Sequence, residues 1–237
     1  MKIIFSSLLL LSVVSSKAQQ SMQSGNMPMV TRSIGASFQK FEGLNSRVAE
    51  SPQFDQLKSH TATLGLGWIK EKNQIVSEGG VTVGSSMSGD RDKKSSTVRY
   101  AAINANIGYD VIKSDRVLLY PLVGLGGQAY QAIFYKDNSA VRFDDVLQSP
   151  VVQNNIQSVR FNNMFFVYRL GVGFAIKSPK NLGSAIGLQA GYTGSFKSRS
   201  WRSNEGQMLA NSPEDKISQY FVSLVFSCKP MFMHKGM

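Results

Sequence analysis

Residues of the types that carry out chemistry are few in this chain. The 237-residue sequence has two histidines, His60 and His234, and one cysteine, Cys228. A zinc site needs three or four Cys, His or carboxylate ligands at suitable spacing, so this composition argues against one. Asp90-Arg91-Asp92 lacks the further oxygen ligands of a calcium loop. We therefore expect no metal site and no cofactor.

His60 is the candidate for a catalytic base, with Asp90 and Asp92 as the acidic residues expected near it. A Ser–His–acid site requires the nucleophile within hydrogen-bond reach of the base. The spacing places no serine beside His60. We interpret His60 as a histidine at the rim of the fold, and we expect no enzyme activity.

A nominal dinucleotide fingerprint occurs at Gly124-Leu125-Gly126-Gly127-Gln128-Ala129, with Asp144 twenty residues after Gly124. The fingerprint requires a following helix whose N-terminus faces a phosphate. Residues 130–135 continue as a strand pattern instead. These glycines are expected to relieve crowding between side chains inside a sheet structure, not to bind a nucleotide.

The N-terminus has the pattern of a secretory signal peptide. A basic start at Lys2 is followed by an apolar run and by Ser16-Lys17-Ala18, which offers small residues before a cleavage site. We assign residues 1–18 to the signal peptide, 19–29 to a short N-terminal segment, 30–228 to the folded domain and 229–237 to a tail.

The folded domain shows a hydrophobic period of two throughout, which indicates β-strands. One example is 97–112, where Ile103, Ile107 and Tyr109 alternate with Asn104 and Asn106. No segment favours a helix. The expected strands are 30–41, 60–70, 75–85, 97–112, 117–135, 163–176, 184–196 and 217–228.

Long and short connections alternate between these strands. The long ones are 42–59, 86–96, 136–162 and 197–216, and the short ones are 71–74, 113–116 and 177–183. Tight turns on one side of a membrane and long loops on the other are typical of a transmembrane meander. The fold class predicted is therefore an all-β, eight-stranded antiparallel up-and-down transmembrane β-barrel.

Aromatic residues on the apolar face fall into two groups, as the two interfaces of a membrane require. The group near the short turns is Trp68, Tyr109, Phe174 and Phe226, and the group near the long loops is Phe38, Tyr192, Phe196 and Tyr220. The alternative is a soluble lipocalin-type barrel with the apolar face inside, which predicts mostly short connections.

The signal peptide, the eight amphipathic strands and the alternating connections resemble the small outer-membrane β-barrels of Gram-negative bacteria, the group that includes OmpX and the membrane domain of OmpA. The last strand is similar to the assembly signal of such barrels, with Gln219, Leu224 and Phe226 in place but Phe221 where glycine is usual. The resemblance implies an integral outer-membrane location. Because some members modify lipid A with a His–Ser–acid site, it also implies a lipid A-modifying enzyme as a less favoured reading.

An eight-stranded barrel is just wide enough for its own side chains to fill. Asn104, Asn106, Asp110, Gln128 and Gln189 should face inward with the charged residues Glu78 and Arg169. Glu78 and Arg169 are expected to lie across the lumen, where they would either neutralise each other structurally or gate a narrow path.

Two surfaces suggest partners. Lysine and arginine gather on the short-turn side, where they can contact anionic headgroups of outer-membrane lipids; they are Lys70, Lys72, Lys113, Arg116, Lys177, Lys180, Lys229 and Lys235. In loop 136–162, Val141-Arg142-Phe143 and Val159-Arg160-Phe161 suggest strands that continue as a protruding hairpin for a protein partner. The alternative is an ordinary solvated loop.

The net charge of +11 is not arranged as a basic stripe with interleaved aromatics, so nucleic-acid binding is not expected. The predicted function is a structural or interaction role: envelope integrity, adhesion, or an accessory part of an outer-membrane assembly. The alternative is a narrow channel for small solutes.

Overall fold

Eight long strands form the body of the protein. The computed structural model describes residues 28–90, 93–178 and 184–229, so the predicted signal peptide and most of the tail lie outside the described residues. The strands are β1 (Met29–Gln39), β2 (His60–Lys72), β3 (Ile75–Gly89), β4 (Ser95–Tyr109), β5 (Val117–Tyr135), β6 (Val159–Lys177), β7 (Ser184–Ser195) and β11 (Ser218–Cys228).

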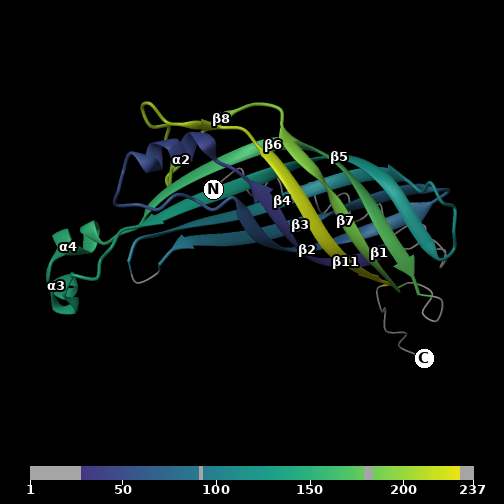
Figure 1. Cartoon of the computed structure of the whole chain (residues 1–237), viewed down its shortest axis with the longest axis horizontal. Coiled ribbons are helices and arrows are strands. Elements are labelled where there is room, and N and C mark those ends of the chain that lie inside the picture. The colour runs from purple at the N-terminus through teal and green to yellow at the C-terminus, as the bar shows by residue number, and fades with distance from the viewer. Residues whose placement is uncertain (1–27, 91–92, 179–183, 230–237) are drawn as a thin grey trace, which may run out of the picture.

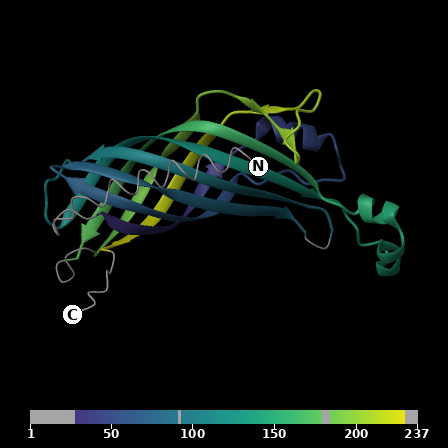
Figure 2. The same ribbon diagram turned by 180° about the vertical axis from the view of Figure 1, so that it is seen from behind.

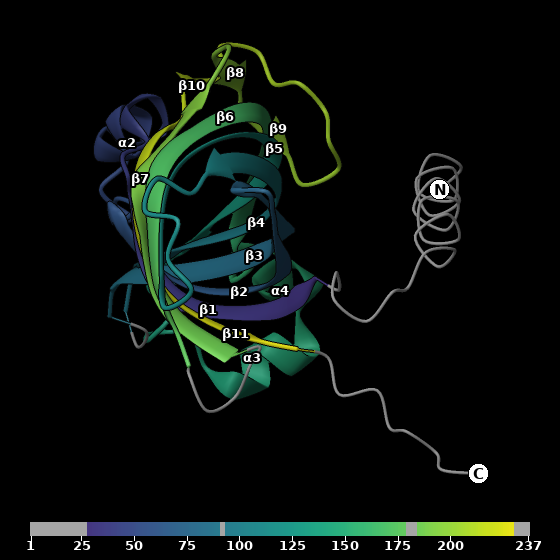
Figure 3. The ribbon, with the colours of Figure 1, turned by 90° about the vertical axis from the view of Figure 1, so that its right-hand side faces the viewer.

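These strands close into an antiparallel barrel. Each pairs with its neighbours along the chain, and β1 pairs with β11 from Val30↔Cys228 to Gln39↔Gln219. The closed ring is visible in Figure 3, where the barrel is seen from one end. The predicted eight-stranded up-and-down barrel is confirmed.

The alternation along each strand sorts side chains between the two faces of the wall. On β4, Ile103 and Ile107 are 57% and 54% exposed, whereas Asn106 between them and the nearby Asp110 are buried. An exposed apolar band on this scale is the surface that a lipid bilayer requires. In the described part of the chain, no helix has both the length and the hydropathy needed to cross a bilayer.

The prediction that no segment forms a helix is wrong, because the described residues include three short helices. They are α2 (Glu42–Ala49), α3 (Phe143–Gln148) and α4 (Pro150–Asn155), all in loops at the same end of the barrel. Leu44 and Val48 bury one face of α2 against the protein. Helices this short depend on such tertiary contacts more than on their own propensity, which is why the sequence period misses them.

The expected alternation of long and short connections holds except between β3 and β4. These two strands extend to Gly89 and Ser95, so residues 90–94 alone connect them. The last loop also contains three two-residue strands, β8 (Arg199–Ser200), β9 (Arg202–Ser203) and β10 (Glu214–Asp215). β8 pairs with β10, and β9 pairs with the outer end of β6.

The interior has three layers along the barrel axis. An apolar cluster at the short-turn end is formed by Ile69, Val76, Leu118, Tyr120 and Leu122. Polar side chains fill the middle. The long-loop end holds a larger apolar cluster that includes Phe41, Leu44, Val98, Tyr130, Phe134, Phe165, Trp201 and Ile217.

Candidate functional site

The middle of the lumen contains the predicted charged residue Glu78, held by three neutral donors. Asn106 Nδ2 donates to Glu78 Oε1 at 2.7 Å, and Gln189 Nε2 and Tyr120 Oη donate to Oε2 at 2.6 and 3.0 Å. These donors come from β4, β7 and β5, so the Glu78 carboxylate connects its own strand, β3, to three other strands across the lumen. Its hydrogen bonds stabilise a buried charge that would otherwise be costly.

Arg169 also lies in the lumen, as predicted, but it does not form an ion pair with Glu78. The three ion pairs found among the described residues involve neither side chain. The Arg169 guanidinium carbon instead lies 3.8 Å from the ring centroid of Phe221, a cation–π arrangement. The aromatic ring that replaces the usual glycine in the last strand therefore provides the contact surface for this arginine.

The space around Arg169 is small. Two cavities of about 40 and 70 Å³ include Arg169 in their walls, and the second also touches Glu78. Each has room for a few water molecules at most. The buried Arg169 Nε has no hydrogen-bond partner among the described protein atoms, and a water in these cavities would satisfy it.

A closed ring of hydrogen bonds lies nearer the long loops. Gln128 Nε2 donates to Gln219 Oε1 at 3.0 Å, Gln219 Nε2 donates to Tyr130 Oη at 3.2 Å, and Tyr130 Oη donates to Gln128 Oε1 at 3.0 Å. The Tyr130 ring then begins the apolar layer, since its centroid lies 5.2 Å from that of Phe41 and 5.3 Å from that of Tyr100.

α2 and the segment from Trp201 to Asp215 form a cap over this end of the barrel, and Asp215 holds the two parts together. Its carboxylate accepts hydrogen bonds from Gly43 N at 2.8 Å, Leu44 N at 3.1 Å and Trp201 Nε1 at 2.7 Å. The first two are free N–H groups at the start of α2, where a carboxylate is favourable. Burial raises the pKa of Asp215 above its usual range, and the three hydrogen bonds limit that rise.

Sequence reasoning did not find this cap. Trp201 is completely buried although it lies in the long connection 197–216. Phe41 packs edge-on against it with centroids 5.7 Å apart. The one available signal was the presence of a tryptophan and an aspartate in a long polar loop, which does not by itself indicate a contact.

Of the eight predicted girdle aromatics, Tyr192 is half-buried and the other seven are exposed on the apolar face of the wall. Phe38, Tyr220 and Tyr192 are register neighbours on β1, β11 and β7. Phe196 continues the group through stacking on Phe166 at 5.4 Å. Phe166 and Tyr168 were not included in the predicted girdle, although Tyr168 lies 5.3 Å from Phe196. At the short-turn end, the exposed members are Trp68, Tyr109, Phe174 and Phe226.

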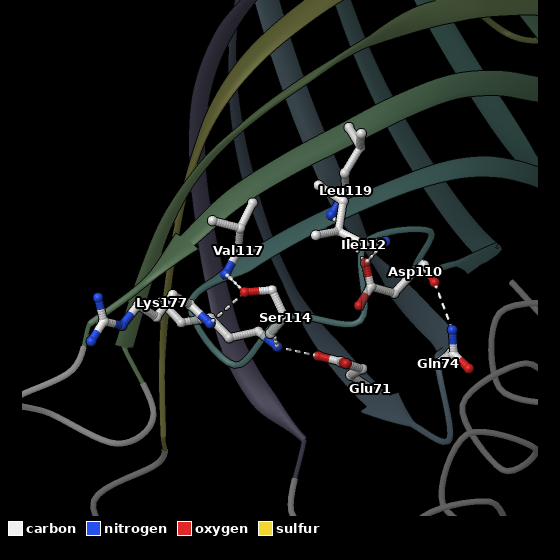
Figure 4. A network of polar contacts seen from close by, with 9 residues as sticks. Glu71, Gln74, Asp110, Ile112, Ser114, Val117, Leu119 and Lys177 are labelled. Atoms are coloured by element: carbon white, nitrogen blue, oxygen red, sulfur yellow. Dashed lines mark hydrogen bonds and ion pairs between the residues drawn. The ribbon is translucent and has the colours of Figure 1, made fainter.

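The short-turn side is organised by local polar contacts (Figure 4). Lys177 Nζ lies 2.7 Å from Glu71 Oε2, and Asp110 Oδ1 accepts from the backbone N–H groups of Ile112 and Leu119 at 3.2 and 3.3 Å. Asp110 is fully buried, and these two hydrogen bonds hold the turn between β4 and β5. Of the predicted basic rim, Lys180 and Lys235 lie outside the described residues.

Loop 136–162 forms a projecting hairpin with a helical tip. Pairing of β5 with β6 continues to Phe134↔Val159, four residues beyond the predicted start of β6. α3 and α4 form the tip, which extends farther from the barrel than the other loops (Figures 1 and 2). Phe143, Leu147 and Val151 on this tip are 75%, 66% and 67% exposed. The predicted protrusion is present, but helices occupy its end.

The remaining candidate residues are scattered. His60 is exposed at the start of β2 opposite Phe38, while Asp92 lies outside the described residues. Gly124 lies inside β5, where an added Cβ would collide with the Asn106 side chain, and Asp144 is on α3. Among the described residues, no three His, Cys, Asp or Glu side chains gather to hold a metal ion.

Comparison with known proteins gives one family match. The family model described as "Outer membrane protein beta-barrel domain" matches residues 6–228. A structure of the attachment invasion locus protein Ail of Yersinia pestis, in complex with the heparin analogue sucrose octasulfate, has 16% identity and a TM-score of 0.47 over 84% of this chain and 98% of that chain. Another structure of Ail has the same identity and coverage and a TM-score of 0.42. No curated protein matches the sequence.

Proposed function

Because the chain belongs to the outer membrane protein β-barrel domain family, and is an integral protein of the outer membrane, we propose that its barrel is a sealed, non-enzymatic anchor. The anchor presents the β5–β6 hairpin outside the cell to a protein partner. In this family the long loops are extracellular and the short turns periplasmic. The observation that carries the proposal is the exposed apolar tip at residues 143–151.

The filled lumen supports an anchor instead of a channel. Hydrogen-bonded polar side chains occupy its middle, and apolar clusters close both ends. The cavities of about 40 and 70 Å³ are too small to hold a continuous column of hydrated ions.

The hairpin is built as a stiff support for its tip. The Phe134 ring lies 6.1 Å from that of Phe161 on the paired strand and 5.7 Å from that of Phe54 in the first loop. Near the tip, Asn138 Nδ2 donates to the Ile156 carbonyl oxygen at 3.2 Å. A segment held in this way loses little conformational entropy when it binds.

The tip itself has the character of a binding surface. Phe143 and Leu147 lie four residues apart on α3, so they share one face of the helix. Exposed apolar clusters on soluble surfaces commonly mark interaction sites. A non-enzymatic role is part of the proposal, because no serine forms a hydrogen bond with the exposed His60 in the described chain; a lipid A profile altered by His60→Ala would contradict it.

Site-specific photocrosslinking in cells tests the proposal. A photoreactive residue at position 147 is expected to cross-link one defined protein, and the same residue at Asn155, on α4 of the same hairpin, serves as the matched control. Phe143→Ser with Val151→Ser should abolish the product while the barrel remains heat-modifiable on gels. Cross-links at 147 that are absent, or that survive the double substitution, would refute the interaction.

A further inference from the structure

A groove of about 860 Å³ lies on the outer wall of the barrel, where β4, β5 and β6 approach the long loops. Its floor is made of small outward-facing residues, Ala101, Gly127 and Ala129. Exposed Met164 and Phe166 from β6 and exposed Met208 from the last loop form its apolar sides. Its lower part is therefore continuous with the lipid-facing wall.

The strand register explains the recess. Gly127 pairs with Ile103 on one side and with Phe166 on the other, so a missing side chain separates two large ones. Two residues along β5 toward the long loops, Ala129 lies between Ala101 and Met164. These small residues leave a recess between the large side chain of Ile103 on one side and those of Met164 and Phe166 on the other, and we call this recess the slot.

A row of polar residues crosses the groove two residues nearer the long loops than Ala129. Arg99 pairs with Gln131, Gln131 with Asn162, and Asn162 with Arg202 of β9. The two arginines are three strand spacings apart, roughly 14 Å at the usual spacing. β9 pairs with the outer end of β6 (Figure 3), and Arg202 of β9 lines the same groove.

The groove carries mostly positive charge, and its arginines are free to bind an anion. Arg99, Arg199 and Arg202 all line it and are exposed, and their guanidinium groups make no hydrogen bond or ion pair within the described part of the chain. One carboxylate, Glu214, also lines the groove and accepts a hydrogen bond from Ser200 Oγ at 3.1 Å. Three cations against one anion leave a net positive site directly above an apolar slot.

We propose that this groove binds a phosphorylated lipid of the outer leaflet. An acyl chain lies in the slot over Ala101, Gly127 and Ala129, and phosphate groups accept hydrogen bonds from Arg99 and Arg202. Guanidinium groups are the side chains best suited to phosphate, because they offer paired N–H donors. The continuity of the slot with the bilayer-facing wall identifies the source of the phosphate as a lipid and not a soluble anion.

The test is native mass spectrometry of the refolded mature chain in a maltoside detergent, with bisphosphorylated lipid A as the probe. A one-to-one adduct is expected. Arg99→Gln with Arg202→Gln should weaken it about tenfold or more, as expected for the loss of charge-assisted contacts. Ala129→Trp, which fills the slot without changing charge, should weaken it as well, and heat-modifiable migration reports folding for each variant.

Matched controls separate this site from general attraction between a basic protein and an anionic lipid. Arg47→Gln with Arg142→Gln removes two exposed loop arginines outside the groove and should leave the adduct unchanged. Dephosphorylated lipid A should bind poorly. Equal losses in the two double variants, no loss in the groove variant, or full displacement of the lipid by inorganic pyrophosphate would each overturn the proposal.

Discussion

Replacing Asp215 with alanine is expected to open the cap over the barrel without unfolding the barrel. The Asp215 carboxylate receives hydrogen bonds from Gly43 N, Leu44 N and Trp201 Nε1. These hydrogen bonds join the first long loop to the last one, beside the ring contact of Phe41 with Trp201. The eight-stranded wall does not depend on it, because the barrel pairings run through other residues.

The magnitude follows from the groups left behind. Each buried donor without a partner costs about 1–3 kcal/mol. Trp201 is fully buried and Leu44 is nearly so, while water reaches the start of α2 more easily. Burying the Asp215 carboxylate has a cost, and this cost raises its pKa. Removing the carboxylate also removes that cost, which offsets part of the loss. We expect the free energy of opening the cap to fall by about 2–4 kcal/mol.

Hydrogen exchange measured by mass spectrometry is the direct assay. At about 1.4 kcal/mol per factor of ten, amide protons of α2 should exchange roughly two orders of magnitude faster in Asp215→Ala. Amides of β1 and β2 should keep their rates. Asp144→Ala on α3 is the control for an exposed aspartate. If the α2 peptides of Asp215→Ala exchange at the wild-type rate, Asp215 does not hold the cap.

Other features give predictions of the same kind. Burial raises the pKa of Asp215, so the closed cap binds the proton more tightly than the open one; protection of α2 should decrease as pH rises through that pKa, and Asp215→Asn should remove this dependence. The filled lumen predicts no steady conductance in planar bilayers, for wild type or for Phe221→Leu, and a stable open level in the wild type would contradict it. Gly124→Leu should lower the yield of heat-modifiable barrel, because its side chain enters space held by Asn106; Val123→Leu on the lipid-facing side should not. Lys177→Gln breaks a partly exposed ion pair with Glu71 and should change barrel stability by less than about 1 kcal/mol in urea titrations.

The strands were predictable because the bilayer imposes one simple rule on every residue of the wall. A side chain either faces lipid or faces the lumen, so a period of two persists over whole strands such as 117–135. The inward placement of Glu78 and Arg169 follows from the same rule. The contacts that each makes do not follow, because they depend on how far the strands are staggered around the ring.

The loop structures were harder to predict because their stability comes from contacts between distant segments. α2 buries Leu44 and Val48 and receives its anchor from Asp215, which is more than 170 positions away. α4 is different, since Ser149 caps it by accepting from Val152 N and Pro150 occupies its first turn. That start signal was present in the sequence, but the run of six residues was too short to show a helical period.

The pairing of β1 with β11 also sets the order of events during assembly. The contact Val30↔Cys228 joins the two ends of the domain, so the ring cannot close until the last strand has been delivered. Until that moment both β1 and β11 present unpaired backbone edges, which in other settings seed aggregation. Closure over such a long separation carries a large entropy cost and is slow. Truncation before residue 218 would therefore leave a permanently open sheet, and cells would have to shield nearly the whole chain until its final strand arrives.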